Sequence, residues 1–362
     1  MRLIVVVGAR ANVVKVAPLL PALTSAGIDT QIAFAGGRHD ALDCGSGFVS
    51  VFGVTMPAPT WYIDRGSGTD ATTTGVAMRS FEQLFSTQHP DGVLVCGDVN
   101  GTFAAAVSAA KAGIPVIHLE AGIRCGDMGL PDEINRVLIS RAAAMHLTPT
   151  AQALENLEDE GIEPERIHFV GNTVAEQALR ELDDAPGNGF VESFGLVKRG
   201  YILAVLHRPD NLANAAWLRA VLDSLGSAEL PVVMPDAVAF VAAVHAAGMS
   251  MPAWIKTLPA VLHLQMLALV REAVCVITDS GGVQEEACVL CAPCITVRHC
   301  TEHVATVTTG ANELVPVDSV AIQAALRSAV GKRRAWAQPA RWDRAVSDRV
   351  VRALRRGIIP LH

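Results

Sequence analysis

Side chains able to transfer protons follow several apolar runs of the chain. Asp98 and Glu120 each stand within two residues of the end of such a run. His207 directly follows a third run, two residues before a proline that cannot continue a strand. Carboxylates and imidazoles in such positions can act as general acids or bases. In the structural alternative, Asp98 caps a helix and His207 is a packing residue.

The stretch Thr278–Ala287, with the sequence TDSGGVQEEA, has the character of an anion site. It follows an apolar run and leads into a predicted helix, so its two glycines leave the backbone open to a ligand. Free N–H groups and the helix dipole favour an anion there, and a phosphate fits best. Glu286 lies one turn further, where it can face a sugar hydroxyl. The alternative is an ordinary strand-to-helix turn capped by Asp279 or Ser280.

Basic residues follow the first apolar run. Arg10 stands in the turn after it, where a guanidinium can bind phosphate oxygens through two hydrogen bonds. Lys15 either assists there or is a solvated helix charge.

Two neighbouring carboxylates, Asp132 and Glu133, open a predicted helix behind a proline. They either take part in chemistry or complement the helix dipole. In the second case Glu120 pairs with Arg124 or Arg136.

Strand-like and helix-like segments alternate regularly and position these residues. The predicted strands are Leu3–Val7, Thr30–Phe34, Gly92–Cys96, Pro115–Leu119, Met145–Leu147, Ile167–Val170, Tyr201–Leu206, Pro231–Met234, Val274–Ile277 and Cys294–Val297. The predicted helices are the segment up to Leu23, Thr74–Phe85, Thr102–Ala112, Glu133–Ala144, Ala151–Glu160 and the amphipathic Arg344–Arg356. Such alternation predicts parallel strands with crossover helices.

The fold class is therefore α/β, with two doubly wound Rossmann-like domains. We place the first at residues 1–172 plus the C-terminal helix 346–362, and the second at residues 173–345. Ligands of open α/β sheets bind beyond the carboxyl ends of the strands, and for both domains this rule predicts a cleft between them.

Composition narrows the function. A chain of 362 residues that is 51% hydrophobic folds into about two domains. A net charge of -7 argues against nucleic acid and anionic membranes as partners, so we expect a small ligand held by a local basic cluster. The sequence contains no apolar stretch of about 18 residues and no signal-like h-region, so we expect a cytoplasmic protein.

Four cysteines, Cys288, Cys291, Cys294 and Cys300, have the spacing C-x2-C-x2-C-x5-C. This spacing invites an iron–sulfur or zinc interpretation. Pro293 interrupts it, and we predict free thiols, with Cys288 and Cys291 on one helix and Cys294 opening a strand. We therefore assign no metal.

Seven motifs taken together resemble the non-hydrolysing UDP-N-acetylglucosamine 2-epimerases. They are GARANVVK at 8–15, GDVNGT at 97–102, HLEAGIR at 118–124, PDEINR at 131–136, GNTV at 171–174, LHRPDN at 206–211 and DSGGVQEEA at 279–287. The resemblance runs from Met1 to about Leu314 and implies the glycosyltransferase-B type of fold and a homodimer.

The resemblance implies inversion at C2 of the sugar in UDP-GlcNAc, giving UDP-ManNAc. The implied route eliminates UDP to a 2-acetamidoglucal and adds UDP back to the other face, without a nicotinamide or metal cofactor. Such an elimination needs a base for the C2 proton and positive or N–H groups for the diphosphate.

The family motifs also assign roles. Asp98, Glu120 and Asp132 match its catalytic carboxylates, and His207 matches its essential histidine. The positions that match diphosphate and ribose contacts, with further substrate-binding candidates added, are Arg10, Ser280, Gly281, Gly282, Glu286, Lys15, Glu133 and Arg136.

The chain departs from the family pattern in four places. Asp132 stands where the family has glutamate, so either the backbone compensates or Glu133 shares the role. The stretch 35–40 lacks the glutamine and histidine tied to allostery in some members, which predicts hyperbolic kinetics. The family stretches P-V-H-P and T-E-R-P-E read PDAV at 235–238 and TEHVA at 301–305, which points to a specialised sugar or natural-product pathway.

Three rival functions remain open. A hydrolysing 2-epimerase would release UDP and ManNAc, and a glycosyltransferase shares the fold. A UDP-sugar sensor would not need the proton-transfer set formed by Asp98, Glu120 and His207.

Overall fold

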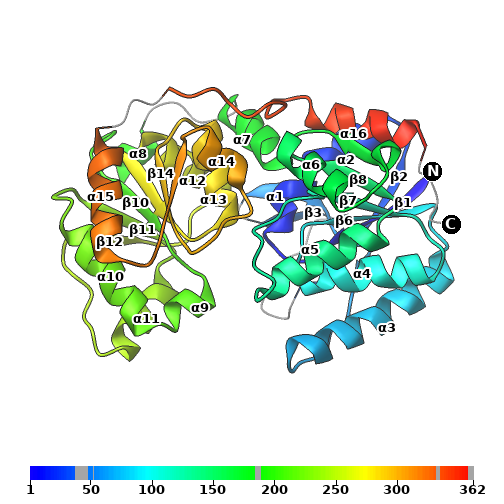
Figure 1. Cartoon of the computed structure of the whole chain (residues 1–362), viewed down its shortest axis with the longest axis horizontal. Coiled ribbons are helices and arrows are strands. Elements are labelled where there is room, and N and C mark those ends of the chain that lie inside the picture. The colour runs from blue at the N-terminus through cyan, green and yellow to red at the C-terminus, as the bar shows by residue number, and fades with distance from the viewer. Residues whose placement is uncertain (37–47, 52, 184–188, 332–334, 358–362) are drawn as a thin grey trace. The chain divides into compact units, whose positions relative to one another are not determined.

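The computed structural model describes residues 1–36, 48–51, 53–183, 189–331 and 335–357 (Figure 1). The positions Gly37–Asp40, on which the expectation of hyperbolic kinetics rests, lie outside these ranges. The chain divides into two compact units. Unit 1 comprises residues 1–177 and 340–362, and unit 2 comprises residues 178–339.

Unit 1 contains a parallel sheet of seven strands in the order β5-β2-β1-β6-β7-β8-β9. These strands are β1 (Arg2–Val7), β2 (Asp29–Phe34), β5 (Trp61–Tyr62), β6 (Gly92–Cys96), β7 (Val116–Leu119), β8 (Met145–Thr148) and β9 (Ile167–Phe169). An antiparallel pair, β3 (Phe48–Val51) and β4 (Val54–Pro57), stands apart from this sheet. The helices are α1 (Asn12–Val16), α2 (Leu19–Ser25), α3 (Asp70–Gln88), α4 (Asn100–Lys111), α5 (Pro131–Ala142), α6 (Ala151–Asp159), the 3-10 turn η2 (Pro164–Arg166), α7 (Thr173–Asp183), which runs into unit 2, and α16 (Val346–Arg355).

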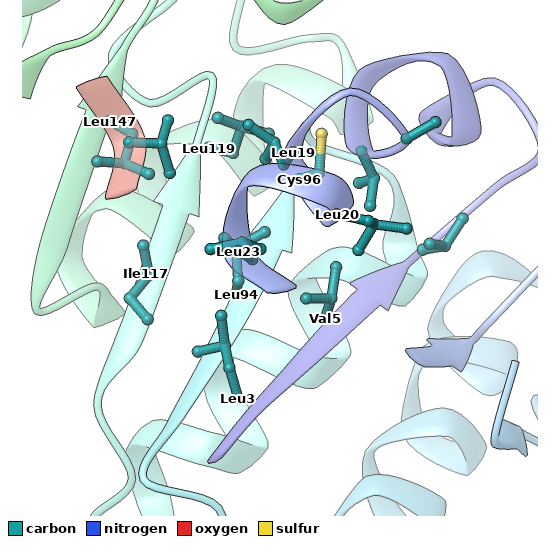
Figure 2. Packing of buried hydrophobic residues seen from close by; sticks show 14 of the residues in the cluster. Leu3, Val5, Leu19, Leu20, Leu23, Leu94, Cys96, Ile117, Leu119 and Leu147 are labelled. Carbon is teal, nitrogen blue, oxygen red and sulfur yellow. The ribbon is translucent and has the colours of Figure 1, made fainter. Parts of the chain in front are cut away.

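Both faces of this sheet are buried, which explains the uninterrupted apolar run of β1. Leu3 and Val5 point to the face covered by α2 and α16, whereas Ile4 and Val6 point to the face covered by α3 and α4. Figure 2 shows the leucines of α2 packed over strands β1, β6 and β7. This rigid core fixes the strand ends from which the polar side chains project.

Unit 2 repeats the design with six parallel strands in the order β12-β11-β10-β13-β14-β15. The strands are β10 (Ile202–Val205), β11 (Val232–Pro235), β12 (Ile255–Leu258), β13 (Cys275–Thr278), β14 (Cys294–Val297) and β15 (Asn312–Val315). The helices are α8 (Phe190–Ser193), α9 (Pro209–Leu212), α10 (Ala215–Gly226), α11 (Val238–Ala246), α12 (His263–Glu272), α13 (Gly281–Val289), α14 (Val304–Thr308) and α15 (Ser319–Val330).

The predicted α/β class with two doubly wound domains is confirmed, and each predicted strand agrees with an observed strand to within one residue at either end. Five strands were not predicted, namely β3, β4, β5, β12 and β15. The residues of β12 and β15 are only partly buried and therefore lack a continuous apolar run. The first predicted helix is wrong as a single element. It divides into α1 and α2 at Pro18, which has no N–H to continue the ladder.

Among the described residues, no helix combines the length and the apolar character that crossing a membrane requires.

Candidate active site

The predicted site residues follow strands at the two places where the strand order reverses. In unit 1 this switch lies between β1 and β6, which lead to Arg10 and Asp98. In unit 2 it lies between β10 and β13, which lead to His207 and Ser280. Crevices at such switch points are the usual ligand sites of doubly wound sheets. The topology therefore supports a functional interpretation of these positions.

Asp98 is fixed by the helix that follows β7. Arg136 of α5 contacts Asp98 Oδ2 through Nη2 at 2.5 Å and through Nε at 2.7 Å. Asn135 donates to the Asp98 backbone carbonyl at 2.8 Å. The carboxylate is still 21% exposed, so it combines a fixed position with access to a ligand.

Glu120 is held in an unusual backbone conformation directly after β7. Its φ is 64°, a left-handed value that costs a non-glycine residue of order 1 kcal/mol or more. Its side chain is 4% exposed, and Lys15 Nζ lies 2.6 Å from Oε2. Of the two arginines named as alternative partners, Arg124 binds Glu160 and Arg136 binds Asp98. Strain of this kind is retained where the side chain must be placed for a function.

The two carboxylates lie around one glycine. Gly97 precedes Asp98 and has a φ of 71°, and a Cβ built on it would stand 3.5 Å from Glu120 Oε2. The buried His118 donates from Nε2 to the Gly97 carbonyl at 3.0 Å, which ties the end of β7 to the end of β6. Burial and the neighbouring His146 lower the pKa of His118 to about 3, so this ring stays neutral. His118 is a positioning residue that the sequence analysis did not identify.

The side chain of Glu133, in the first turn of α5, is bound to the loop that precedes this helix. It is 1% exposed, accepts from the amides of Cys125 and Gly126, and pairs with Arg136 Nη1 at 2.7 Å. Burial alone would raise the pKa of Glu133, but the hydrogen bonds from Arg136 and the two amides outweigh it and hold this pKa below its ordinary value. Asp132, one residue earlier, is half-buried. The structure thus gives Glu133 a structural task and leaves Asp132 as the better candidate for the third carboxylate role.

In unit 2, Asp279 organises the turn that carries His207. Asp279 is fully buried and accepts from the backbone amides of His207 and Arg208 at 3.0 and 3.1 Å and from Asn211 Nδ2 at 3.0 Å. The His207 side chain is 58% exposed, with Nδ1 4.0 Å from Asp279 Oδ1. The backbone of His207 is therefore fixed while its imidazole can reach a ligand.

Ser280 is the N-cap residue of α13 and is followed by two helical glycines with different surroundings. A Cβ on Gly281 would come within 2.6 Å of His303 Nε2, whereas a Cβ on Gly282 would meet nothing within 4 Å. Gly281 therefore allows His303 to lie against the first turn, and Gly282 leaves open space beside it. The first-turn amides and the helix dipole favour an anion at this end.

His303 adds positive charge to that end of α13. Its Nδ1 lies 3.0 Å from Glu285 and its Nε2 lies 3.5 Å from Glu302. Burial alone would lower the pKa of His303, but these two carboxylates outweigh burial and raise it to about 10. Glu302 also pairs with Arg298 at 2.9 Å and with Arg208 at 3.7 Å. Three cationic groups thus lie among the carboxylates Glu285, Glu302 and Asp279 at this end of α13, and the first-turn amides add N–H donors for a phosphate.

Glu286 lies one turn into α13, as predicted, and is 6% exposed. His263 Nε2 lies 2.9 Å from its Oε1. Arg10 and Lys15 occupy the turn and the short helix after β1, and Arg10 is half-buried. The sequence offered a signal for Asp279, at a strand end before two glycines, and for Glu302, in the stretch TEHVA at 301–305, but none for His263.

The four clustered cysteines lie in different elements. Among the described residues, no group of three or more His, Cys, Asp or Glu side chains is arranged to hold a metal ion. Cys288 lies in α13 and Cys294 opens β14, as predicted. Cys291 is not helical, because it follows the end of α13 with a φ of 55°.

Comparisons with known proteins agree with these features. The sequence profile of the family described as UDP-N-acetylglucosamine 2-epimerase matches residues 22–355. A UDP-N-acetylglucosamine 2-epimerase from Methanocaldococcus jannaschii is 33% identical, over 99% of this chain and 100% of that protein. A UDP-2,3-diacetamido-2,3-dideoxy-D-glucuronate 2-epimerase from Pseudomonas aeruginosa is 32% identical, over 92% of this chain and 93% of that protein.

A crystal structure of the Methanocaldococcus jannaschii enzyme in complex with UDP-GlcNAc and UDP matches with a TM-score of 0.88, at 32% identity over 99% of this chain and 100% of that chain. This likeness confirms the glycosyltransferase-B type of fold. The profile match and the identity over nearly the whole chain show that this protein belongs to the UDP-N-acetylglucosamine 2-epimerase family, and that its activity is that of an epimerase.

Proposed function

We propose that the chain interconverts UDP-GlcNAc and UDP-ManNAc as a non-hydrolysing epimerase. The observation that carries this proposal is the pair of carboxylates around Gly97, each fixed by its own cation and one of them on a strained backbone. Inversion at C2 removes a proton from one face of the sugar and delivers one to the other face. That reaction needs more than one proton-transfer group.

In the proposed reaction a carboxylate takes the C2 proton, the electrons of the C–H bond form the C1–C2 double bond, and the C1–O bond breaks to release UDP. Asp98, with a fifth of its side chain exposed, is better placed than the buried Glu120 to reach a sugar. Asp132 supplies the third carboxylate, and His207, exposed on a fixed backbone, assists the charge that develops on the phosphate. Re-addition of UDP reverses these steps after the C2 proton has been replaced on the other face.

UDP is proposed to bind at the start of α13. The amides of Gly281 and Gly282, the Ser280 cap and the charged His303 favour the diphosphate, and Glu286 accepts from the ribose. Arg10 and Lys15 are further diphosphate and substrate contacts, as the family resemblance implies. Retention of UDP keeps it beside the glucal at a high effective concentration, so re-addition is faster than escape.

The resemblance further supports a homodimer, and the changed stretch 301–305 supports a role in a specialised pathway. Light scattering, which measures the molar mass in solution, tests whether the protein is a homodimer.

The experiment is proton NMR of UDP-GlcNAc incubated with the protein in deuterated water. We expect UDP-ManNAc with deuterium at C2, and deuterium in the recovered UDP-GlcNAc. Product with protium fully retained at C2 would rule out elimination. Stoichiometric UDP and free ManNAc would favour the hydrolysing epimerase, and binding without exchange or product would favour a sensor.

A further inference from the structure

The imidazole of His263, the first residue of α12, lies between two carboxylates. Its Nδ1 is 2.9 Å from Glu181 Oε2, and its Nε2 is 2.9 Å from Glu286 Oε1. Carboxylate oxygens only accept at this distance, so both ring nitrogens donate and the ring carries both protons. Burial alone would lower the pKa of His263, but the hydrogen bonds and charges of Glu181 and Glu286 outweigh burial and raise it to about 10. An imidazolium therefore holds Glu286 in place.

Glu286 shares this imidazolium with Glu181, one turn into α13. A buried carboxylate needs hydrogen-bond donors, and the ionised diphosphate diester of a UDP-sugar offers none. A sugar hydroxyl can donate. The start of α13 thus suits an anion, and the Glu286 position suits a hydroxyl donor.

We propose that His263 is a positioning residue that orients Glu286 toward the ribose hydroxyls of the nucleotide, and so determines the preference for a ribonucleotide. This inference rests on the proposed function, in which α13 binds UDP. With Oε1 engaged by His263, Oε2 of Glu286 can accept from the ribose. Without His263, Glu181 and Glu286 repel each other, and Glu286 turns away from the ligand.

The test compares UDP with 2′,3′-dideoxy-UDP, which lacks both ribose hydroxyls, by isothermal titration calorimetry. For the native protein we expect UDP to bind about tenfold or more tightly, because a hydrogen bond to a charged group is lost with the analogue. In His263→Gln this ratio should fall to within about twofold of one, with little change in the affinity for the dideoxy compound. A purely structural role for His263 would weaken both ligands equally.

A second pair of variants avoids dependence on the folding of His263→Gln. Glu181→Ala removes the acceptor at Nδ1 and should lower the ratio, whereas Glu181→Gln keeps a carbonyl oxygen for Nδ1–H and should largely preserve it. In Glu286→Gln the affinity ratio of UDP to the dideoxy compound should fall toward one. Adding His263→Gln to this variant should not lower the ratio further, because the two residues act together.

The outcomes separate the inference from the proposed function. Failure of the native protein to bind UDP, or equal binding of both compounds, would overturn the binding role of α13 and the inference with it. Native preference that persists unchanged in His263→Gln and Glu181→Ala would overturn the inference alone.

Discussion

Lys15 Nζ lies 2.6 Å from Glu120 Oε2; Lys15 is in α1, the short helix after β1, and Glu120 directly follows β7. The lysine compensates a buried carboxylate whose backbone is left-handed. Because the ion pair joins segments that are far apart in the sequence, it forms only when the sheet is complete. A residue held this way is positioned before any ligand arrives, which is what proton transfer requires.

Loss of either carboxylate around Gly97 should abolish turnover. We expect Asp98→Asn and Glu120→Gln each to reduce kcat on the order of a hundredfold or more, since neither amide can accept the C2 proton. Affinity for UDP, measured by calorimetry, should persist. The matched control is Glu163→Gln, which removes a largely exposed carboxylate that pairs with Arg166. Near-normal turnover in both site variants would refute the assignment.

Substitutions of Asp132 and Glu133 should have different effects, the first on turnover and the second on folding stability. Glu133→Gln removes a buried charge that faces Arg136 and should lower the free energy of unfolding by about 2 kcal/mol or more. Asp132→Asn should leave the unfolding midpoint in urea nearly unchanged and reduce kcat. If Asp132→Asn turns over normally while the folded Glu133→Gln protein is inactive, Glu133 takes the catalytic role instead.

The apolar runs of the sequence predicted ten of the fifteen strands that the structure describes, and with them the strand ends that carry the candidate residues. Apolar runs buried on both faces mark strands, and the residues after them fall at the carboxyl edge of a parallel sheet. Partners distant in sequence were not predictable. The contact of Glu120 with Lys15, 105 positions away, was not predicted from the sequence. The role of His263 was not predictable either, because it depends on contacts with Glu181 and Glu286 from two other helices.

Folding stability should be greatest near neutral pH. Burial, the largest cause, lowers the pKa of His118 to about 3 and that of His146 to about 4. These rings bind protons only in the unfolded chain as pH falls below about 6.5, so their contribution is present above that pH and is lost below it. For His263 and His303 the folded pKa is raised to about 10. Their contribution is present below about 6.5 and is lost as pH rises toward 10.

Each histidine that binds one more proton in one state than in the other changes the free energy of unfolding by at most about 1.4 kcal/mol per pH unit. Urea unfolding of the whole chain at closely spaced pH values measures both limbs. In His263→Gln the free energy of unfolding should fall less steeply as pH rises toward 10, and its dependence on pH below about 6.5 should stay as it is. An alkaline limb of unchanged slope in that variant would contradict the charged state assigned to His263.

His207 should affect rate more than affinity. Its backbone is held by Asp279 and its ring is largely exposed, so His207→Asn removes the imidazole without a buried partner being lost. We expect kcat to fall about a hundredfold while UDP affinity changes less than about threefold. A change in stability alone, with normal kcat, would show that the histidine is structural.

The two glycines of the first turn of α13 form a matched pair for testing the diphosphate site. In Gly281→Ala the new Cβ would stand 2.6 Å from His303 Nε2, and His303 is held by Glu285 and Glu302, so the clash should cost about 1 to 3 kcal/mol of folding stability. In Gly282→Ala the Cβ meets no protein atom within 4 Å, so stability should be unchanged or slightly raised. The same methyl group occupies the open space through which a phosphate would approach the amides, so UDP affinity should fall about tenfold or more. Calorimetry with UDP and thermal unfolding without it measure the two effects separately. If the Gly282→Ala protein binds UDP as tightly as the native protein, the diphosphate does not bind at this turn.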